Sequence, residues 1–305
     1  MGHHHQHHKE KPEEAGKVRM RLKVAFALNF FFTIIEFIGG AITNSMAILS
    51  DAVHDLGDTV AIGSALWLEK VAEKGSDNRY TYGYRRFSTL GALLTSLILF
   101  AGSIIILKEA IPRLLQPQEV MAKGMMWMAV LGIVFNGLAV WRLRGGNASL
   151  NNRAVMLHLM EDVLGWVAVL IGSIVIFYTE WFWIDPLLSI GVAIYILYHV
   201  FGNVRKILDV FLQTTPSDLD VVGMEQELVA LDGVHEVHDT HSWSLDGNYN
   251  VLSIHVVVDK DASVSTQQGI RGRADEIIRT YGIDHATVAI EFTGEACHNC
   301  RKIKG

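Results

Sequence analysis

The stretch that decides the fold covers residues 44–68 and reads NSMAILSDAVHDLGDTVAIGSALWL. It is apolar over most of its length, yet it carries Asp51, His54, Asp55 and Asp58. A helix that spans a bilayer needs about 20 mainly apolar residues. Ionisable side chains are costly inside a membrane, so their presence indicates function. The stretch therefore predicts a membrane helix that carries polar chemistry.

The composition of the whole chain points the same way. Half of the 305 residues are hydrophobic, and the mean hydropathy is +0.27, which is high for a soluble protein. The net charge of −6 argues against nucleic acid as a partner. Further apolar stretches long enough to enter a bilayer are Val24–Ile42, Thr89–Leu107, Met125–Val140, Leu164–Phe177 and Pro186–Val200.

We expect six membrane helices, with ends uncertain by a few residues. Lysine and arginine concentrate in the N-terminal segment and in the second and fourth connections. Because cytoplasmic loops carry the excess of these residues, we expect both termini in the cytoplasm. We also expect the protein to reside in the cytoplasmic (inner) membrane. The expected helices are Val18–Thr43, Ser45–Ala72, Phe87–Leu115, Ala122–Leu143, Leu150–Phe177 and Trp183–Arg205.

Beyond Arg205 the pattern changes, because acidic residues become frequent and apolar runs shorten. The α-β-β-α-β order expected there predicts a small two-layer α+β domain. The chain thus divides into a histidine-rich cytoplasmic tail (1–17), a six-helix transmembrane domain (18–205) and a cytoplasmic domain (206–305). The expected elements of the last domain are Leu219–Leu231, Val234–Leu245, Tyr249–Val258, Val264–Thr280 and Ala286–Phe292, with a turn at residues 246–248.

Two His–Asp pairs with the same spacing lie on two of the expected helices, His54 with Asp58 and His158 with Asp162. Residues four apart share one helical face. Two such helices that face each other offer two imidazole nitrogens and two carboxylate oxygens, a tetrahedral set that suits zinc. Cobalt and cadmium accept the same donors, whereas copper(I) prefers thiolates. The two carboxylates would also neutralise a divalent cation, which lowers the cost of burying it.

The other ionisable residues of these helices are weaker candidates. Asp51 lies on about the same face as His54 and is a candidate outer partner of the ligands. Asp55 and Glu161 each stand one position from a proposed ligand and point elsewhere. A structural role is favoured for these residues and for Glu36, and a lone His-x-x-x-Asp would also favour packing. The repetition of the pair on two helices favours metal ligands instead.

At these residues the sequence resembles the cation diffusion facilitator family, in its zinc-transporting form. The resemblance implies six spans, a ferredoxin-like cytoplasmic domain, a homodimer and divalent metal/proton antiport. It covers nearly the whole chain beyond the N-terminal tail. The stretches that carry it are residues 27–29, Glu36, Gly39-Gly40, residues 44–58, Tyr82-Gly83 with Arg85, Leu150-Asn151 through Ala154, His158 and Asp162, Asp185-Pro186 and residues 212–216.

The same resemblance implies a metal site in the cytoplasmic domain. His238, His255 and Glu291, one on each expected strand, match positions where the family binds cytoplasmic metal. Cys297 and Cys300 have the spacing that two thiolates use on one zinc, but two thiolates do not complete a site. Some animal relatives complete a similar pair with N-terminal residues of the partner chain.

The N-terminal run HHHQHH at residues 3–8 could play that part here. It is equally compatible with a natural metal-collecting tail and with an added affinity tag. Some bacterial relatives carry a further metal site in the second connection. The corresponding positions here are Tyr80 and Tyr84, and only Asp77 remains as a ligand type, so no loop site is expected.

The expected function is export of Zn²⁺ from the cytoplasm in exchange for protons, in the service of metal homeostasis. Zinc is then the transported ion and is also bound by the cytoplasmic domain. An enzyme is disfavoured, because the chain has no His-Glu-x-x-His and four protein ligands would saturate the ion. Two alternatives stay open: a membrane-bound metal sensor that transports nothing, and a transporter for Co²⁺, Cd²⁺ or Fe²⁺.

Overall fold

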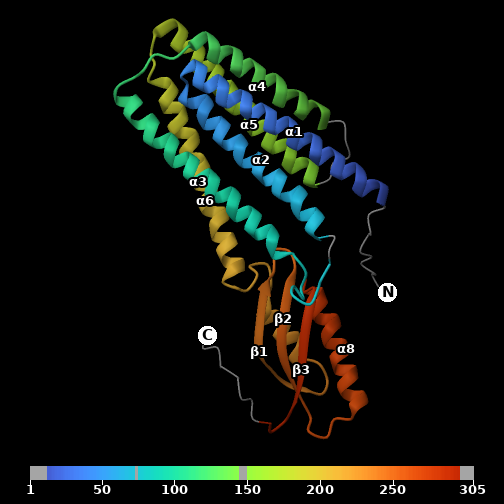
Figure 1. The fold of residues 1–305 in the computed structure, drawn as a ribbon. Helices are drawn as coiled ribbons and strands as arrows, with labels where there is room; N and C mark the ends of the chain where they lie inside the picture. The colour runs from blue at the N-terminus through green and yellow to red at the C-terminus, as the bar shows by residue number, and fades with distance from the viewer. Residues whose placement is uncertain (1–11, 73–74, 144–149, 296–305) are drawn as a thin grey trace. The chain divides into compact units, whose positions relative to one another are not determined.

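The computed structural model describes residues 12–72, 75–143 and 150–295 (Figure 1). The described residues form two compact units. A helical unit comprises residues up to 74 together with 91–203, and an α+β unit comprises 75–90 together with the chain from 204 onward. The long helices are α1 (Pro12–Thr43), α2 (Met46–Ala72), α3 (Arg86–Leu115), α4 (Ala122–Leu143), α5 (Leu150–Thr179) and α6 (Ile184–Phe211).

Four of these helices are long and apolar enough to cross a membrane, judged by length and composition over the described residues. The acids of α2 interrupt its apolar run, and the apolar part of α4, Ala122–Leu138, is shorter than a full span. The helical membrane domain is therefore confirmed, and six spans stay a prediction. The qualifying segments are Phe26–Thr43, Arg86–Leu115, Leu159–Thr179 and Ile184–Phe211.

The helix bounds agree with the expected ones to within two residues, except at the two outer ends. Helix α1 begins at Pro12, before the expected Val18, and α6 continues to Phe211, beyond the expected Arg205. The membrane-based prediction ended α6 at the first positive charges. The helix continues beyond Arg205 because residues 206–215 contain neither proline nor glycine.

The core of the helical unit joins α1, α2, α4 and α5 around Trp166, whose side chain is only 1% exposed. Its ring contacts Phe32 of α1 edge to face, with centroids 6.1 Å apart. Gly132 of α4 makes the approach of the indole possible, since a Cβ at that position would lie 2.3 Å from the ring. This contact fixes α5 against α4 one turn beyond Asp162. A second cluster ties α2 to α3 and α6 through Met46, Val53, Ile106, Ala110 and Ala193.

The start of α2 is held by Asp185, a fully buried residue at the start of α6. The Ser45 hydroxyl donates to its Oδ1 at 2.5 Å, and the backbone N–H groups of Met46 and Ala47 donate to its carboxylate at 2.7 and 3.2 Å. The first N–H groups of a helix have no partner within the helix, and a negative charge is favourable beside them. Asp185 therefore positions the helix that carries His54 and Asp58.

Replacing Asp185 with asparagine is expected to lower the melting temperature of the purified protein. The amide has one acceptor oxygen instead of two and no charge, and a hydrogen bond to a charged group contributes about 1.5–3 kcal/mol. Thermal unfolding in detergent measures the loss. Asp261→Asn, at an exposed position of the α+β unit, is the matched control and should change nothing. Equal melting temperatures for the two variants would show that the buried cap contributes little.

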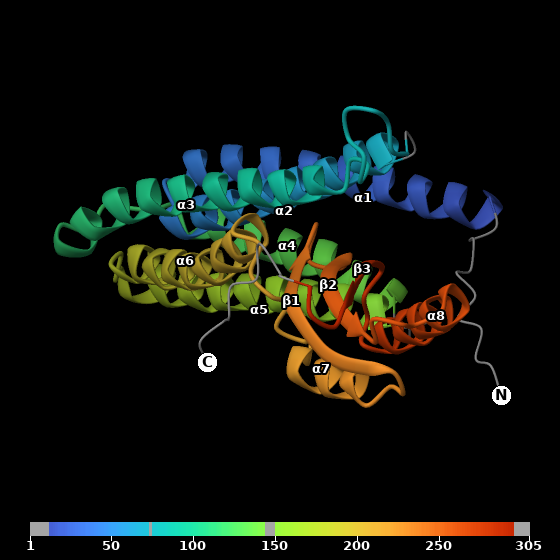
Figure 2. The same cartoon turned by 90° about the horizontal axis from the view of Figure 1, so that it is seen from below.

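The α+β unit contains α7 (Val221–Val229), β1 (Val234–Ser244), β2 (Asn250–Val258), α8 (Val264–Thr280) and β3 (His285–Phe292), which confirms the expected α-β-β-α-β order. The sheet order is β1-β2-β3, with β1 antiparallel and β3 parallel to the central strand (Figure 2). Leu252, Ile254 and Val256 of β2 pack in one core with residues of both helices. Because strand side chains alternate, His255 projects from the opposite face.

The connection at residues 75–90 packs on the turn between β1 and β2. The Arg85 guanidinium lies 4.3 Å from the Tyr249 ring centroid, and its Nη1 lies 3.7 Å from Asp246 Oδ2. The Tyr82 ring meets His285 edge to face, with centroids 5.6 Å apart. The connection between α2 and α3 is therefore a packed part of the α+β unit.

Candidate metal centres

The structure brings three of the predicted membrane ligands together. His54 and Asp58 lie on α2, and Asp162 lies on α5. The Nε2 atom of His54 is 3.9 Å from Asp58 Oδ2 and 3.9 Å from Asp162 Oδ1. Two atoms that each bind one zinc at about 2 Å lie at most about 4 Å apart. Both distances fall within this limit, so the imidazole nitrogen and the two carboxylates lie near one another, and their role as ligands of one ion stays a prediction.

The fourth predicted ligand, His158, belongs to α5 by its backbone, and its side chain lies outside the described part of the structure. It precedes Asp162 by four residues in the sequence. Its role as a ligand stays a prediction.

Further carboxyl groups surround this site. Glu36 of α1 is fully buried. Its carboxyl neighbours that of Asp55, also buried, so Asp55 faces α1. Glu161 is exposed, and its Oε2 accepts a hydrogen bond from the Tyr195 hydroxyl of α6 at 3.4 Å. The sequence favoured structural roles for all three, and the pairing of Glu36 with Asp55 was beyond it.

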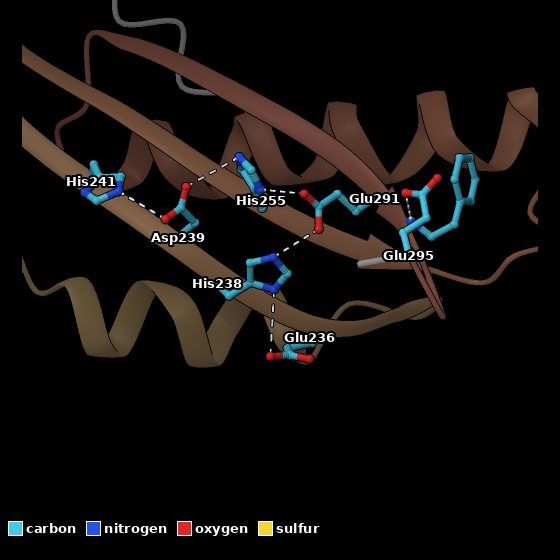
Figure 3. A network of polar contacts seen from close by, with 8 residues as sticks. Glu236, His238, Asp239, His241, His255, Glu291 and Glu295 are labelled. Atoms are coloured by element: carbon cyan, nitrogen blue, oxygen red, sulfur yellow. Dashed lines mark hydrogen bonds and ion pairs between the residues drawn. The ribbon is translucent and has the colours of Figure 1, made fainter. Parts of the chain in front are cut away.

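A second cluster lies on the sheet of the α+β unit (Figure 3). His238 of β1 stands directly opposite His255 of β2, and Glu291 comes from β3. Glu291 Oε1 lies 2.7 Å from His255 Nδ1, and Oε2 lies 3.0 Å from His238 Nε2. One ligand atom from each of the three residues lies within 4.8 Å of the others. The three residues predicted from three separate strands therefore share one place.

One atom of this cluster shows that its residues suit a metal ion. His255 Nδ1 is buried and makes no hydrogen bond within the described residues, although a carboxylate oxygen lies 2.7 Å away. A nitrogen and an oxygen that are close but not aligned for a hydrogen bond are placed like two ligands of a common ion. Two imidazoles and one carboxylate are a set that zinc accepts, with a fourth position left open.

The remaining predicted positions divide into two kinds. Cys297, Cys300 and residues 3–8 lie outside the described residues. Asp77 lies in the described connection and accepts hydrogen bonds from the backbone N–H of Arg79 and Tyr80 and from the Tyr84 hydroxyl, at 2.7–2.8 Å. The Tyr80 N–H bond, followed by that from Tyr84, lowers the pKa of Asp77 below its ordinary value. Asp77 therefore has a structural role in this connection.

A helical membrane unit with a His–Asp–Asp cluster between two helices, followed by an α+β unit with a His–His–Glu cluster, defines a membrane protein that handles divalent cations. The chain belongs to the cation efflux family, as its resemblance to the cation diffusion facilitators predicts. The transmembrane domain of that family matches residues 22–212, and the cytoplasmic domain of cation efflux proteins matches residues 216–292. The protein is thus a membrane transporter with a cytoplasmic C-terminal domain, and not an enzyme.

Curated relatives cover nearly the full chain. A cadmium, cobalt and zinc/H(+)-K(+) antiporter of Bacillus velezensis is 34% identical over 98% of this chain and 94% of its own length. The metal cation efflux system protein CzcD of Cupriavidus metallidurans is 34% identical over 95% of this chain and 90% of its own length. The zinc transporter ZitB of Escherichia coli is 32% identical over 100% of this chain and 98% of its own length.

Proposed function

We propose that this protein exports Zn²⁺ from the cytoplasm in exchange for protons. The observation that carries the proposal is the position of His54 Nε2, 3.9 Å from one carboxylate of its own helix and 3.9 Å from one of α5. Relatives named for zinc transport and for metal/proton antiport support the choice of ions. Cobalt and cadmium, which the names of some relatives include, remain alternative cargoes.

In the proposed site His54, Asp58, His158 and Asp162 surround the ion. The two carboxylates balance its charge, which lowers the cost of holding it between apolar helices. Because the ligands come from α2 and α5, a small relative displacement of the two helices would separate them and release the ion. Rocking of the helices between inward-facing and outward-facing states would then supply alternating access.

Protons compete with zinc for the same side chains. A metal ligand must be deprotonated, and histidine has a reference pKa of about 6.5, so moderate acidity outside the cell displaces the ion. Protonated ligands then return inward and lose their protons to the more alkaline cytoplasm. The transport of zinc in one direction is therefore coupled to the transport of protons in the other, because one site holds either a metal ion or protons.

The architecture that we propose around this site extends the fold described above. Six spans cover residues 18–205, residues 1–17 form a cytoplasmic tail, and residues 206–305 form a cytoplasmic domain of ferredoxin-like type. Both termini then lie in the cytoplasm, and the protein resides in the inner membrane as a homodimer. The match to the cytoplasmic domain of cation efflux proteins supports the dimer.

A resident zinc ion bound by His238, His255 and Glu291 completes the proposal. Its ligands would come from three strands of the cytoplasmic domain. The bound ion would tighten the homodimer and so act as a sensor of cytoplasmic metal load. Cys297 and Cys300 would form a further site with the histidine run of the partner chain. Metal sensing by the cytoplasmic domain is compatible with transport, whereas a sensor without transport is the competing function.

The proposed exchange site is tested by zinc binding as a function of pH. In a purified variant that combines Glu291→Ala with Cys297→Ser and Cys300→Ser, and so lacks both proposed cytoplasmic sites, zinc affinity is expected to fall steeply from about pH 7.5 to 5.5, across the reference pKa of histidine. Adding His54→Ala should remove this pH-dependent component. A zinc affinity that stays constant over this range would contradict a site shared by metal and protons. Normal binding without flux in liposomes would favour the sensor.

A further inference from the structure

Strand β1 is irregular at the cytoplasmic cluster. Its register with β2 shifts between His238 and His241, and Asp239 between them has a positive φ of 49°. Successive side chains of a regular strand point to opposite faces. An irregularity of this kind re-aims a side chain, and the left-handed conformation is one that aspartate tolerates better than most residues. The Asp239 carboxylate consequently lies between His241 and His255, on the side of the sheet that carries His238 (Figure 3).

The Asp239 carboxylate contacts the ring nitrogen of His255 that the metal cluster does not use. Its Oδ2 lies 3.7 Å from His255 Nε2, whereas His255 Nδ1 faces Glu291 Oε1 at 2.7 Å. Its Oδ1 lies 3.2 Å from His241 Nε2. Asp239 is only 15% exposed, so solvent weakens these contacts less than on an open surface. Each ring nitrogen of His255 thus has its own carboxylate.

We propose that Asp239 is a positioning residue of the cytoplasmic metal centre. Its carboxylate attracts the Nε2–H of His255 and so leaves the lone pair on Nδ1, the atom that faces Glu291. A carboxylate behind a metal-binding imidazole fixes the tautomer and orientation of the ring and raises its basicity. The inference rests on the proposed metal site at His238, His255 and Glu291. It adds a residue that is not itself a ligand.

The other imidazole has a weaker version of the same arrangement. His238 Nε2 faces Glu291, and its Nδ1 lies 3.7 Å from Glu236 Oε1. Glu236 is 68% exposed, so solvent screens its charge and side-chain freedom weakens the contact. The effect of a positioning carboxylate should therefore be larger at His255 than at His238.

Asparagine at position 239 separates the charge from the backbone conformation. It also tolerates a positive φ, so it keeps the irregular strand while removing the negative charge. Asp259 provides a matched control, because its Oδ1 lies 2.6 Å from His235 Nε2 in the same unit and His235 is not a proposed ligand. Asp259→Asn removes a carboxylate from a histidine without touching the cluster.

The experiment is a competition of the full-length chain with a chromophoric chelator for zinc. Every variant also carries His54→Ala and Asp162→Ala, which silence the membrane site, and Glu291→Ala identifies the zinc that the cluster binds. Asp239→Asn is expected to weaken that component about 10–100-fold, the usual effect of losing an outer carboxylate partner. Asp259→Asn is expected to leave it unchanged. The melting temperature of metal-free protein should be the same for Asp239→Asn and its parent.

The outcomes separate this inference from the proposed metal site. A Glu291→Ala variant that binds zinc like its parent would overturn the cytoplasmic site itself. Loss in Glu291→Ala with parental affinity in Asp239→Asn would keep the site and overturn the role of Asp239. If the metal-free melting temperature of Asp239→Asn fell together with its affinity, the residue would be structural, and the inference would also fail.

Discussion

Replacement of Asp162 by alanine is expected to abolish zinc uptake into proteoliposomes, and His54→Ala should have the same effect. His54 Nε2 lies 3.9 Å from the Asp162 carboxylate, so each substitution removes one ligand of the same ion. Loss of an outer partner alone weakens metal binding about 10–100-fold, and loss of a ligand should cost at least the upper end of that range. The measurement is the initial rate of zinc entry, followed with an indicator trapped inside the liposomes.

Glu161→Gln is the matched control for these variants. It removes a carboxylate from the residue next to Asp162, one whose side chain accepts a hydrogen bond from Tyr195 of α6. It should retain most of the wild-type rate. If Asp162→Ala transported zinc as well as Glu161→Gln does, the ion would have to cross the helical unit at another place.

Gly132→Leu is expected to prevent stable folding of the helical unit. A Cβ at this position would lie 2.3 Å from the buried ring of Trp166, so the ring or the helix would have to shift. Overpacking of a well-packed core typically costs about 1–3 kcal/mol, and occasionally more. Because Trp166 follows Asp162 by one helical turn, the displacement should also disturb the membrane site. Thermal stability of the detergent-solubilised protein measures the first effect, and zinc flux the second.

Gly137→Leu provides the comparison within the same helix. A Cβ at Gly137 meets no atom within 4 Å, and leucine gains similar helix propensity at both positions. The difference in melting temperature between the two variants therefore isolates the contact with Trp166. Similar melting temperatures would show that α4 and α5 do not depend on this close approach.

The sequence could predict the features that depend on residues close to one another in the chain. The repeated His–Asp spacing on two apolar helices singled out His54, Asp58 and Asp162, which the structure places near one another. Residues i and i+4 share a face wherever the helix lies. Apolar periodicity and turn residues placed Val264–Thr280 with the bounds that the structure gives to α8. The cytoplasmic trio needed the family resemblance, since nothing local indicates that three strands bring those side chains together.

Other features depend on contacts between distant segments. Asp185 caps α2, a helix that starts about 140 residues earlier in the chain. The sequence around Pro186 gives no indication that Asp185 contacts the start of that helix. The need for a glycine at position 132 follows only from its close contact with the Trp166 ring. The positive φ of Asp239 accompanies a register shift in the pairing of β1 with β2. The sequence around Asp239 predicts a regular strand without such a shift. Motif spacing therefore predicts the candidate ligands, whereas the residues that contact them from distant segments can be identified only in the folded chain.

The most direct test of the account is simultaneous recording of zinc and proton movement in liposomes that contain the wild-type protein. With a higher zinc concentration on one side and the membrane potential held fixed, zinc should move down its gradient while protons move in the opposite direction. An imposed pH gradient should drive zinc against its own concentration gradient. Zinc movement that neither moves protons nor responds to the pH gradient would contradict the proposal that one His–Asp site carries both ions.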